Sequence, residues 1–208
     1  MTAYAKDERR QLADLLLRLG PDEPTLCAGW TTRDLAAHIV VRERRPDASA
    51  GQLVRPLREH GEQVRLAKAA EPYPTIVHEL RTPPWWSPVS NPLVDELTNT
   101  AEMFIHHEDV RRGTPGWEPR ALDPGLERAL WRAARFTGKV ALRRLAVPVT
   151  VRATGLGSFT VGDDPQVTIT GPAGELALFL SGRQGAARVE VTGPADLAER
   201  LRTARLGI

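Results

Sequence analysis

NPLVDELTNTAEMFIHHEDVRR, residues 91–112, is the stretch around which the rest of the chain is best organised. Asn91 is a favourable N-cap residue, and Pro92 suits the first helical position because its backbone φ is already fixed. Two arginines occupy the last turn and a glycine follows them, as is common where helices end. The stretch therefore predicts a single helix over residues 91–112.

Six polar side chains of this helix fall on one narrow stripe when it is wound at about 100° per residue. Apolar residues cover the remaining faces, and a helix that is apolar nearly all round is expected to be buried. A buried ionisable group costs free energy unless a partner compensates it. The stripe consists of Asp95, Thr98, Asn99, Glu102, His106 and Asp109.

Glu102 and His106 stand at positions i and i+4, so their side chains meet on one face of the helix. A histidine and a carboxylate at this spacing suit two ligands of one divalent metal ion, zinc or a similar ion. A helix-stabilising Glu–His pair has the same spacing. The metal interpretation therefore needs a third ligand from elsewhere in the chain.

The composition is that of an ordinary globular protein, with 208 residues of which 41% are hydrophobic and 26% are charged. The net charge of +2 gives no electrostatic case for binding nucleic acid. Cys27 is the only cysteine, which rules out an internal disulfide and fits a reducing cytosol. No apolar run suits a signal peptide or a membrane span. We expect a cytoplasmic monomer or homodimer with no membrane partner.

Apolar residues at helical spacing predict several further helices before residue 147. Thr31, followed three residues later by Asp34, is a capping-box-like start for the second of them. The charged run RERR that ends this second helix is interpreted as a solvated helix end. Four long helices joined by loops suggest a bundle, in which sites form between facing helices. The expected helices cover residues 3–19, 32–45, 51–69, 74–80 and 124–146.

The character of the sequence changes at Pro148, where short β-branched runs between glycines and turn residues begin to predict strands. Strands are expected over residues 149–153, 158–161, 167–170 and 188–192, and helices over residues 172–182 and 194–206. The predicted fold class is therefore α+β. It combines a helical bundle over residues 1–147 with a small α/β domain over residues 148–208.

His38 lies in the middle of the expected second helix, among apolar neighbours. A histidine in such a place is often a core residue with a satisfied hydrogen bond. Combined with Glu102 and His106, however, it completes a set of two histidines and one glutamate from two helices. Three protein ligands leave a fourth position open, which is the arrangement of a catalytic zinc site. Asn99, Asp95 and Asp109 are candidates for supporting hydrogen bonds to the imidazoles.

LCAGWTTRDLAAHIVVRE, residues 26–43, resembles the Cys-x-Gly-Trp-x-x-x-Asp-Leu-x-x-His segment of the mycothiol-dependent maleylpyruvate isomerase family, which is related to the DinB-like bundles. That family binds a divalent metal, usually zinc, through one histidine and a later Glu-x-x-x-His pair. The matching positions here are His38, Glu102 and His106. The resemblance implies a DinB-like four-helix bundle.

VTITGPAGELALFLSGR, residues 167–183, is similar to the smaller, sterol-carrier-like α/β domain of the same family. The resemblance therefore extends over almost the whole chain. PPWWSP and HHEDVRRGTPGWEPR resemble a sub-branch of metal-binding proteins from high-GC bacteria, for which no reaction is assigned.

A zinc ion with an open position can bind a thiol, favour its thiolate at neutral pH and direct it at an electrophile. The resemblance implies mycothiol as that thiol, and hence a transferase or isomerase that acts on a small electrophile. A second hypothesis is a metal-dependent hydrolase that needs no thiol, with Asp95 or Asp109 as general base. A third is a non-enzymatic metal-binding or regulatory protein, in which a protein side chain fills the fourth position.

Arg183, in the turn after residues 172–182, is a candidate contact for a carboxylate of the substrate or thiol, because guanidinium binds carboxylates bidentately. It equally suits a cation at a helix C-terminus. Cys27 is interpreted as a small hydrophobe because the sequence places no base beside it to make it a nucleophile.

The pair Trp85 and Trp86 is expected to plug the end of the bundle or to line a pocket mouth, with plugging preferred. His107 points about 100° away from His106 and is expected at the surface or in a supporting position behind the ligands.

Overall fold

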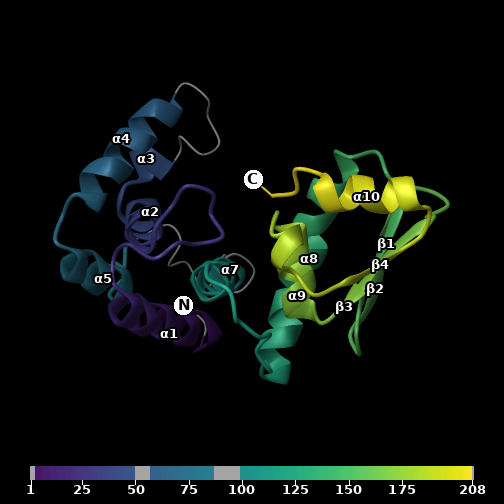
Figure 1. Ribbon diagram of the computed structural model, residues 1–208, viewed down its shortest axis with the longest axis horizontal. Coiled ribbons are helices and arrows are strands. Elements are labelled where there is room, and N and C mark those ends of the chain that lie inside the picture. The colour runs from purple at the N-terminus through teal and green to yellow at the C-terminus, as the bar shows by residue number, and fades with distance from the viewer. Residues whose placement is uncertain (1–2, 50–56, 87–98, 208) are drawn as a thin grey trace. The chain divides into compact units, whose positions relative to one another are not determined.

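The computed structural model describes residues 3–49, 57–86 and 99–207, and these residues confirm the α+β class. They form nine α-helices and one four-stranded mixed sheet (Figure 1). The chain divides into two compact units, Met1–Trp117 and Glu118–Ile208. No helix within the described ranges combines the length and the hydropathy needed to cross a bilayer.

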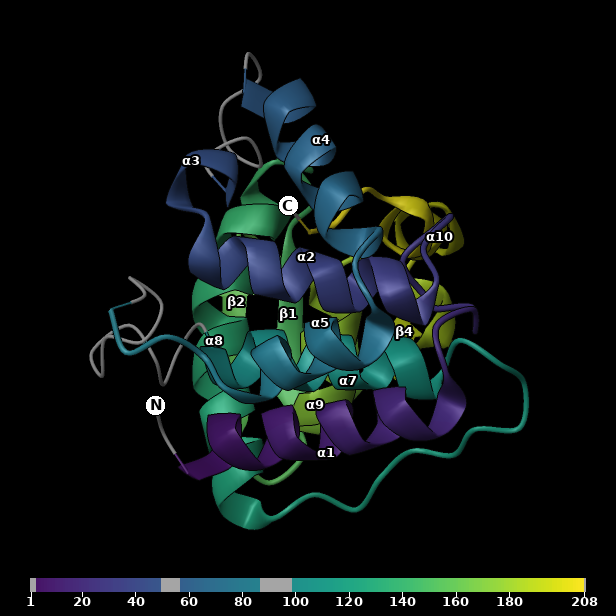
Figure 2. The ribbon, with the colours of Figure 1, turned by 90° about the vertical axis from the view of Figure 1, so that its left-hand side faces the viewer.

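The first unit consists of helices, and five of them, α1, α2, α4, α5 and α7, contribute apolar side chains to its core. Helix α1 packs against both α5 and α7, and α2 packs against α4 and α5. Figure 2 shows α5 and α7 lying between α1 and α2 in that view. The helices of this unit are α1 (Ala3–Leu19), α2 (Thr32–Arg44), α3 (Pro46–Ser49), α4 (Arg58–Ala69), α5 (Tyr73–Arg81) and α7 (Thr100–Arg111).

Local sequence signals place the start of α2 as predicted. The backbone N–H of Thr31 donates to Oδ2 of Asp34 at 3.0 Å, as in a capping box.

The prediction for α7 is confirmed over Thr100–Arg111 only. The expected start of that helix at residues 91–98 lies outside the described residues, as does the beginning of the helix expected over residues 51–69.

One buried ion pair and one buried histidine–carboxylate contact link helices of the first unit. Arg9 of α1 pairs with Glu43 of α2, and both side chains are almost fully buried. Nδ1 of His107 lies 2.8 Å from a carboxylate oxygen of Glu8, also buried, which links α7 to α1. The expectation of a surface position for His107 is therefore wrong. Removing either Arg9 or Glu43 would leave an uncompensated buried charge.

The second unit is a mixed sheet with two helices on one of its faces. Strand order is β2-β1-β3-β4, with β1 parallel to β3 and the other neighbours antiparallel. Helices α8 and α9 pack on each other and lie on one face of the sheet (Figure 1). The elements are α8 (Pro124–Arg143), β1 (Val149–Ala153), β2 (Gly157–Val161), β3 (Val167–Gly171), α9 (Ala173–Leu180), the 3-10 turn η5 (Gln184–Ala186), β4 (Glu190–Thr192) and α10 (Ala195–Thr203).

Helix α8 belongs to the second unit, which differs from the boundary expected near residue 147. The ring of Trp131 on α8 lies 5.6 Å from that of Phe159 on β2. Gly138 of α8 allows close contact with α9, because a Cβ there would lie 2.7 Å from Leu180 Cδ1. Apolar periodicity predicts that a helix has a buried face, but it does not identify the element that covers this face.

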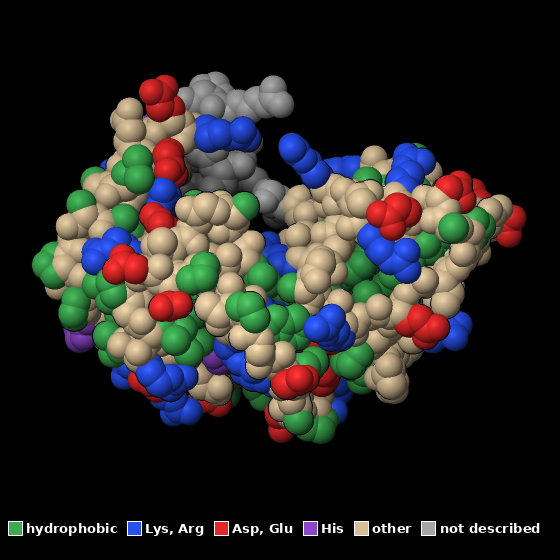
Figure 3. All heavy atoms as spheres, in the orientation of Figure 1, with side chains coloured by type: hydrophobic (Ala, Val, Ile, Leu, Met, Phe, Trp, Pro, Cys, Tyr) green, Lys and Arg blue, Asp and Glu red, His purple; other side chains and the backbone are tan. Residues whose placement is uncertain are grey.

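The two tryptophans of PPWWSP do not plug the bundle. Trp85 is 90% exposed and Trp86 is 49% exposed, so the preferred interpretation of this pair is wrong. The surface shown in Figure 3 mixes basic and acidic side chains over both units, in keeping with the small net charge of +2.

Candidate metal centre

The structure brings His38 of α2 together with Glu102 and His106 of α7. Their potential ligand atoms all lie within 4.8 Å of one another. Nε2 of His106 is 3.2 Å from Oε1 of Glu102, and the rings of His38 and His106 are 5.4 Å apart and nearly perpendicular. These are the three residues that the sequence selected, and they form one group across two helices.

The helices position this group at the edge of the core. His38 belongs to α2, and its neighbours on that helix, Leu35 and Ile39, are fully buried. The side chain of His106 is 8% exposed, whereas that of Glu102 is 27% exposed. The group therefore combines an apolar surrounding with access from solvent on the side of Glu102.

Burial and neighbouring charges give the three side chains different protonation behaviour. Burial, with the charge of His106, lowers the pKa of His38 to about 3, so His38 is neutral and can offer a nitrogen lone pair at pH 7. Burial opposes the charged form of Glu102, but its pKa is held below the usual range by the hydrogen bond and charge of His106 and by Arg42. The pKa of His106 is raised despite burial, above all through its hydrogen bond with Asp109.

Asp109 lies behind the group and is fully buried. Its Oδ2 is 3.0 Å from Nδ1 of His106 and 3.3 Å from Sγ of Cys27, whose thiol donates to it. Because Nδ1 of His106 faces Asp109, Nε2 is the nitrogen that faces Glu102. A carboxylate that orients a ligating imidazole in this way is common behind metal ligands. Cys27, His106 and Asp109 also form a second group of possible ligands.

A four-residue turn supplies two side chains to the surroundings of the group. The N–H of Trp30 donates to the carbonyl of Cys27 at 2.9 Å, and Gly29 between them has a positive φ of 78°. The turn directs Cys27 to Asp109 and brings the Trp30 ring to 4.9 Å from that of His38. Cys27 is partly buried against the core, as expected of a small hydrophobe. The sequence did not predict its hydrogen bond to Asp109.

Arg42 is a residue near the site that the sequence interpretation missed. Its Nε lies 3.3 Å from Oε1 of Glu102, and its side chain is only 11% exposed. Glu43, the next residue of RERR, is 1% exposed, so the interpretation of this run as a solvated helix end is wrong for both. The spacing of Arg42 from His38, one helical turn, was the available signal.

The other predicted residues have different outcomes. Asn99 is buried, and its Oδ1 lies 3.5 Å from Nη1 of Arg42. Asp95 lies outside the described residues. Arg183 is in the second unit, where its Nη1 donates to the carbonyl of Ser181 at 2.6 Å. This is the contact of a cation at the C-terminus of α9, and its predicted role in binding a carboxylate stays a prediction.

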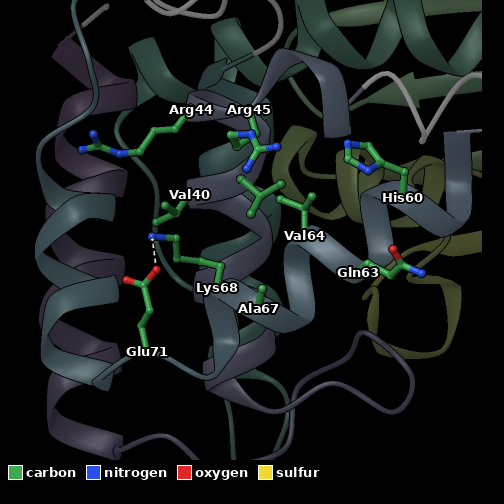
Figure 4. Close-up of a pocket in the computed structure, with 10 residues that line it drawn as sticks. Val40, Arg44, Arg45, His60, Gln63, Val64, Ala67, Lys68 and Glu71 are labelled. Atoms are coloured by element: carbon green, nitrogen blue, oxygen red, sulfur yellow. Dashed lines mark ion pairs between the residues drawn. The ribbon is translucent and has the colours of Figure 1, made fainter.

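A cavity of about 450 Å³ lies between α2 and α4, away from these residues (Figure 4). Its wall combines apolar residues with charged residues that already have partners. Lys68 points to Glu71 and pairs with it at 2.7 Å, and Arg45 pairs with Asp47 at 2.7 Å. None of the three candidate ligands lines the cavity, so it provides no argument about their chemistry.

Comparison of the chain with family models, with curated proteins and with solved structures found no match.

Proposed function

We propose that the protein binds one divalent metal ion, zinc or a similar ion, through His38, Glu102 and His106. The observation that carries the proposal is the convergence of their ligand atoms from two helices to within 4.8 Å. Two imidazoles and one carboxylate are a donor set that suits such an ion. The neutral state of His38 and the orientation of His106 by Asp109 fit this role.

The fourth position is available to an exogenous ligand in this proposal. Among residues 3–49, 57–86 and 99–207, no further His, Cys, Asp or Glu joins the three in one group. This argues for an enzyme over a purely structural or regulatory metal site. A divalent ion at this place would supply Lewis-acid chemistry, which lowers the pKa of a bound thiol or water.

We further propose a metal- and mycothiol-dependent transferase or isomerase that acts on a small electrophile. The resemblance of residues 26–43 to the maleylpyruvate isomerase family, with its DinB-like bundle, supports this choice. The contacts of Asp109 also favour it over hydrolysis. Its Oδ2 already accepts from His106 and Cys27, so it is poorly placed to act as a general base.

Metal analysis of the purified protein tests the metal site. We expect about one divalent ion per chain, and a loss of most of it in His38→Ala and in His106→Ala. His60→Ala is the matched control, because His60 is exposed and pairs with Asp47. Full metal retention by both site variants would disprove the proposed ligands.

Incubation of the metal-loaded protein with mycothiol and a panel of electrophiles tests the reaction. We expect a conjugate or an isomer that depends on His38 and His106. If the loaded protein neither binds mycothiol nor forms any product, the thiol-dependent reaction is excluded and the metal site is unaffected.

A further inference from the structure

We propose that Arg42 is the recognition site for a carboxylate on the ligand that enters beside His38, Glu102 and His106. The inference rests on the proposed metal site and adds the chemical class of its ligand. It assigns a binding role to a residue of α2 that is not itself a metal ligand.

The contacts of Arg42 place its guanidinium at the open side of the group. Its Nε lies 3.3 Å from the same Glu102 oxygen that His106 Nε2 approaches at 3.2 Å. Its Nη1 lies 3.5 Å from Oδ1 of Asn99, which helps to fix the plane of the guanidinium. Among the residues that the structure describes, Nη2 of Arg42 has no assigned partner and remains able to donate.

A divalent ion at the group would add positive charge beside the guanidinium of Arg42, which favours an anion there. The two carboxylates in contact with the group, Glu102 and Asp109, supply two negative charges. The ion's two positive charges and that of Arg42 exceed them by one. The side chain of Arg42 is only 11% exposed, so water compensates this excess poorly. An anionic ligand removes it.

A carboxylate fits this position better than a neutral ligand because it has two oxygens and one negative charge. Guanidinium forms strong charge-assisted hydrogen bonds with carboxylates, and Nη2 is the donor of Arg42 that remains for such a bond. The contact of Arg42 Nε with Glu102 keeps the guanidinium beside the proposed metal ligands, where a carboxylate on the incoming ligand can reach Nη2. The ligand class is therefore a small molecule that carries a carboxylate.

Titration of Co²⁺-loaded protein with acetate tests the inference, because the visible absorption of Co²⁺ responds to the ligands around it. We expect acetate to bind about 10- to 100-fold more weakly to Arg42→Gln, the loss expected for a charge-assisted hydrogen bond. Arg42→Lys should recover part of the affinity because it keeps the charge. Imidazole, a neutral ligand, should bind the wild type and Arg42→Gln equally.

Arg44→Gln is the matched control, since Arg44 is on the same helix and pairs with Glu79 instead. Co²⁺ content is measured for each protein before the titration. Equal acetate affinity in wild type and Arg42→Gln would overturn the inference. Loss of Co²⁺ from Arg42→Gln would also overturn it, because Arg42 would then serve Glu102 and not a ligand. Wild-type protein that takes up no Co²⁺ would instead disprove the metal site itself.

Discussion

Asp109 links helix α7, which carries His106, to the loop that carries Cys27. One of its carboxylate oxygens accepts hydrogen bonds from the imidazole of His106 and from the thiol of Cys27. The Asp109 side chain is fully buried. A fully buried carboxylate with two such neighbours holds the imidazole in one orientation. The ability of His106 to ligate a metal therefore depends on a residue that is not itself in the ligand set.

Asp109→Asn keeps the shape of this side chain and removes its charge. We expect the affinity for Zn²⁺ to fall about 10- to 100-fold, because supporting carboxylates behind ligating histidines contribute on this scale. Competition with a chromophoric chelator measures the affinity. Cys27→Ala should have a smaller effect, since the bond between His106 and Asp109 is left intact. Asp14→Asn, at an exposed position of α1, serves as control. Wild-type affinity in Asp109→Asn would contradict the supporting role.

The sequence was sufficient to predict the ligand candidates because helical spacing and side-chain chemistry are local. Glu102 and His106 follow from their i, i+4 relation. His38 joined them because the pair needed a third ligand and because residues 26–43 resemble a metal-binding segment. Arg42, Trp30 and Cys27 could not be placed around them in this way. Their contacts with Glu102, His38 and Asp109 arise from the packing of α2 and a turn against α7. Residues distant in sequence meet only in the tertiary structure.

At the scale of the elements, the end of α7 is held against the loop that carries Cys27. The N–H of Leu26 donates to the carbonyl of Asp109 at 3.0 Å, so this loop is bonded directly to the helix. Gly113 follows α7 at a point where a Cβ would overlap the carbonyl of Pro24. The glycine was predicted as a helix stop, and the structure adds close backbone contact as a second reason for it.

The contact between α5 and α1 depends on a buried tyrosine. Tyr73 is 7% exposed and its hydroxyl donates to the carbonyl of Leu16 at 3.0 Å. Burial disfavours the phenolate and raises the pKa of Tyr73 to about 12. Between the ordinary pKa, near 10, and this value, the unfolded chain loses the proton while the folded chain keeps it.

The stability of the wild type should therefore contain a contribution from Tyr73 that is fully present below about pH 10 and is lost as pH rises toward 12. Tyr73→Phe should lose roughly 1 kcal/mol at neutral pH with the hydrogen bond, and decline less steeply above pH 10. Urea unfolding followed by circular dichroism from pH 8 to pH 11 measures both effects. Parallel alkaline curves for wild type and variant would show that Tyr73 does not titrate differently on folding.

The elements themselves were largely predictable. The helix over Tyr73–Arg81 and all four strands were expected within a few residues of their observed bounds. Caps, prolines and alternating β-branched residues act over short distances, which explains this agreement. Which elements pack against each other was less predictable. The sequence of an amphipathic helix such as α8 shows that one face is buried but not which element covers it. The tryptophans of PPWWSP show the same limit, since their size suggested burial.

Each of the two units of the chain, Met1–Trp117 and Glu118–Ile208, has a hydrophobic core of its own. The three candidate ligands, and the described residues named above as their neighbours, belong to Met1–Trp117. The second unit forms its core from one face of the sheet together with α8 and α9. Val149, Val151 and Ala153 of β1 point to this core and are buried, while Arg152 between them is exposed. The sheet therefore needs both helices to cover its apolar face.

Two fragments distinguish the observed boundary from the one expected near residue 147. Residues 118–208 include α8, whose buried face contains Leu126, Leu130, Trp131 and Leu142. Each of these large side chains contributes about 1.5–3 kcal/mol on burial, so their sum is comparable to the whole stability of a small domain. We expect residues 118–208 to unfold cooperatively on heating.

Residues 148–208 should instead show no cooperative transition and should bind a dye that detects exposed apolar surface. Circular dichroism against temperature and dye fluorescence measure these properties, with the full chain as control. Without α8, the sheet would be left with one covering helix, and α9, whose residues are all buried, would lose the helix on which it packs. A cooperative transition of residues 148–208 at the same temperature as residues 118–208 would assign α8 to the helical unit. It would also mean that the sheet and α9 alone bury enough apolar surface to offset the conformational entropy of folding.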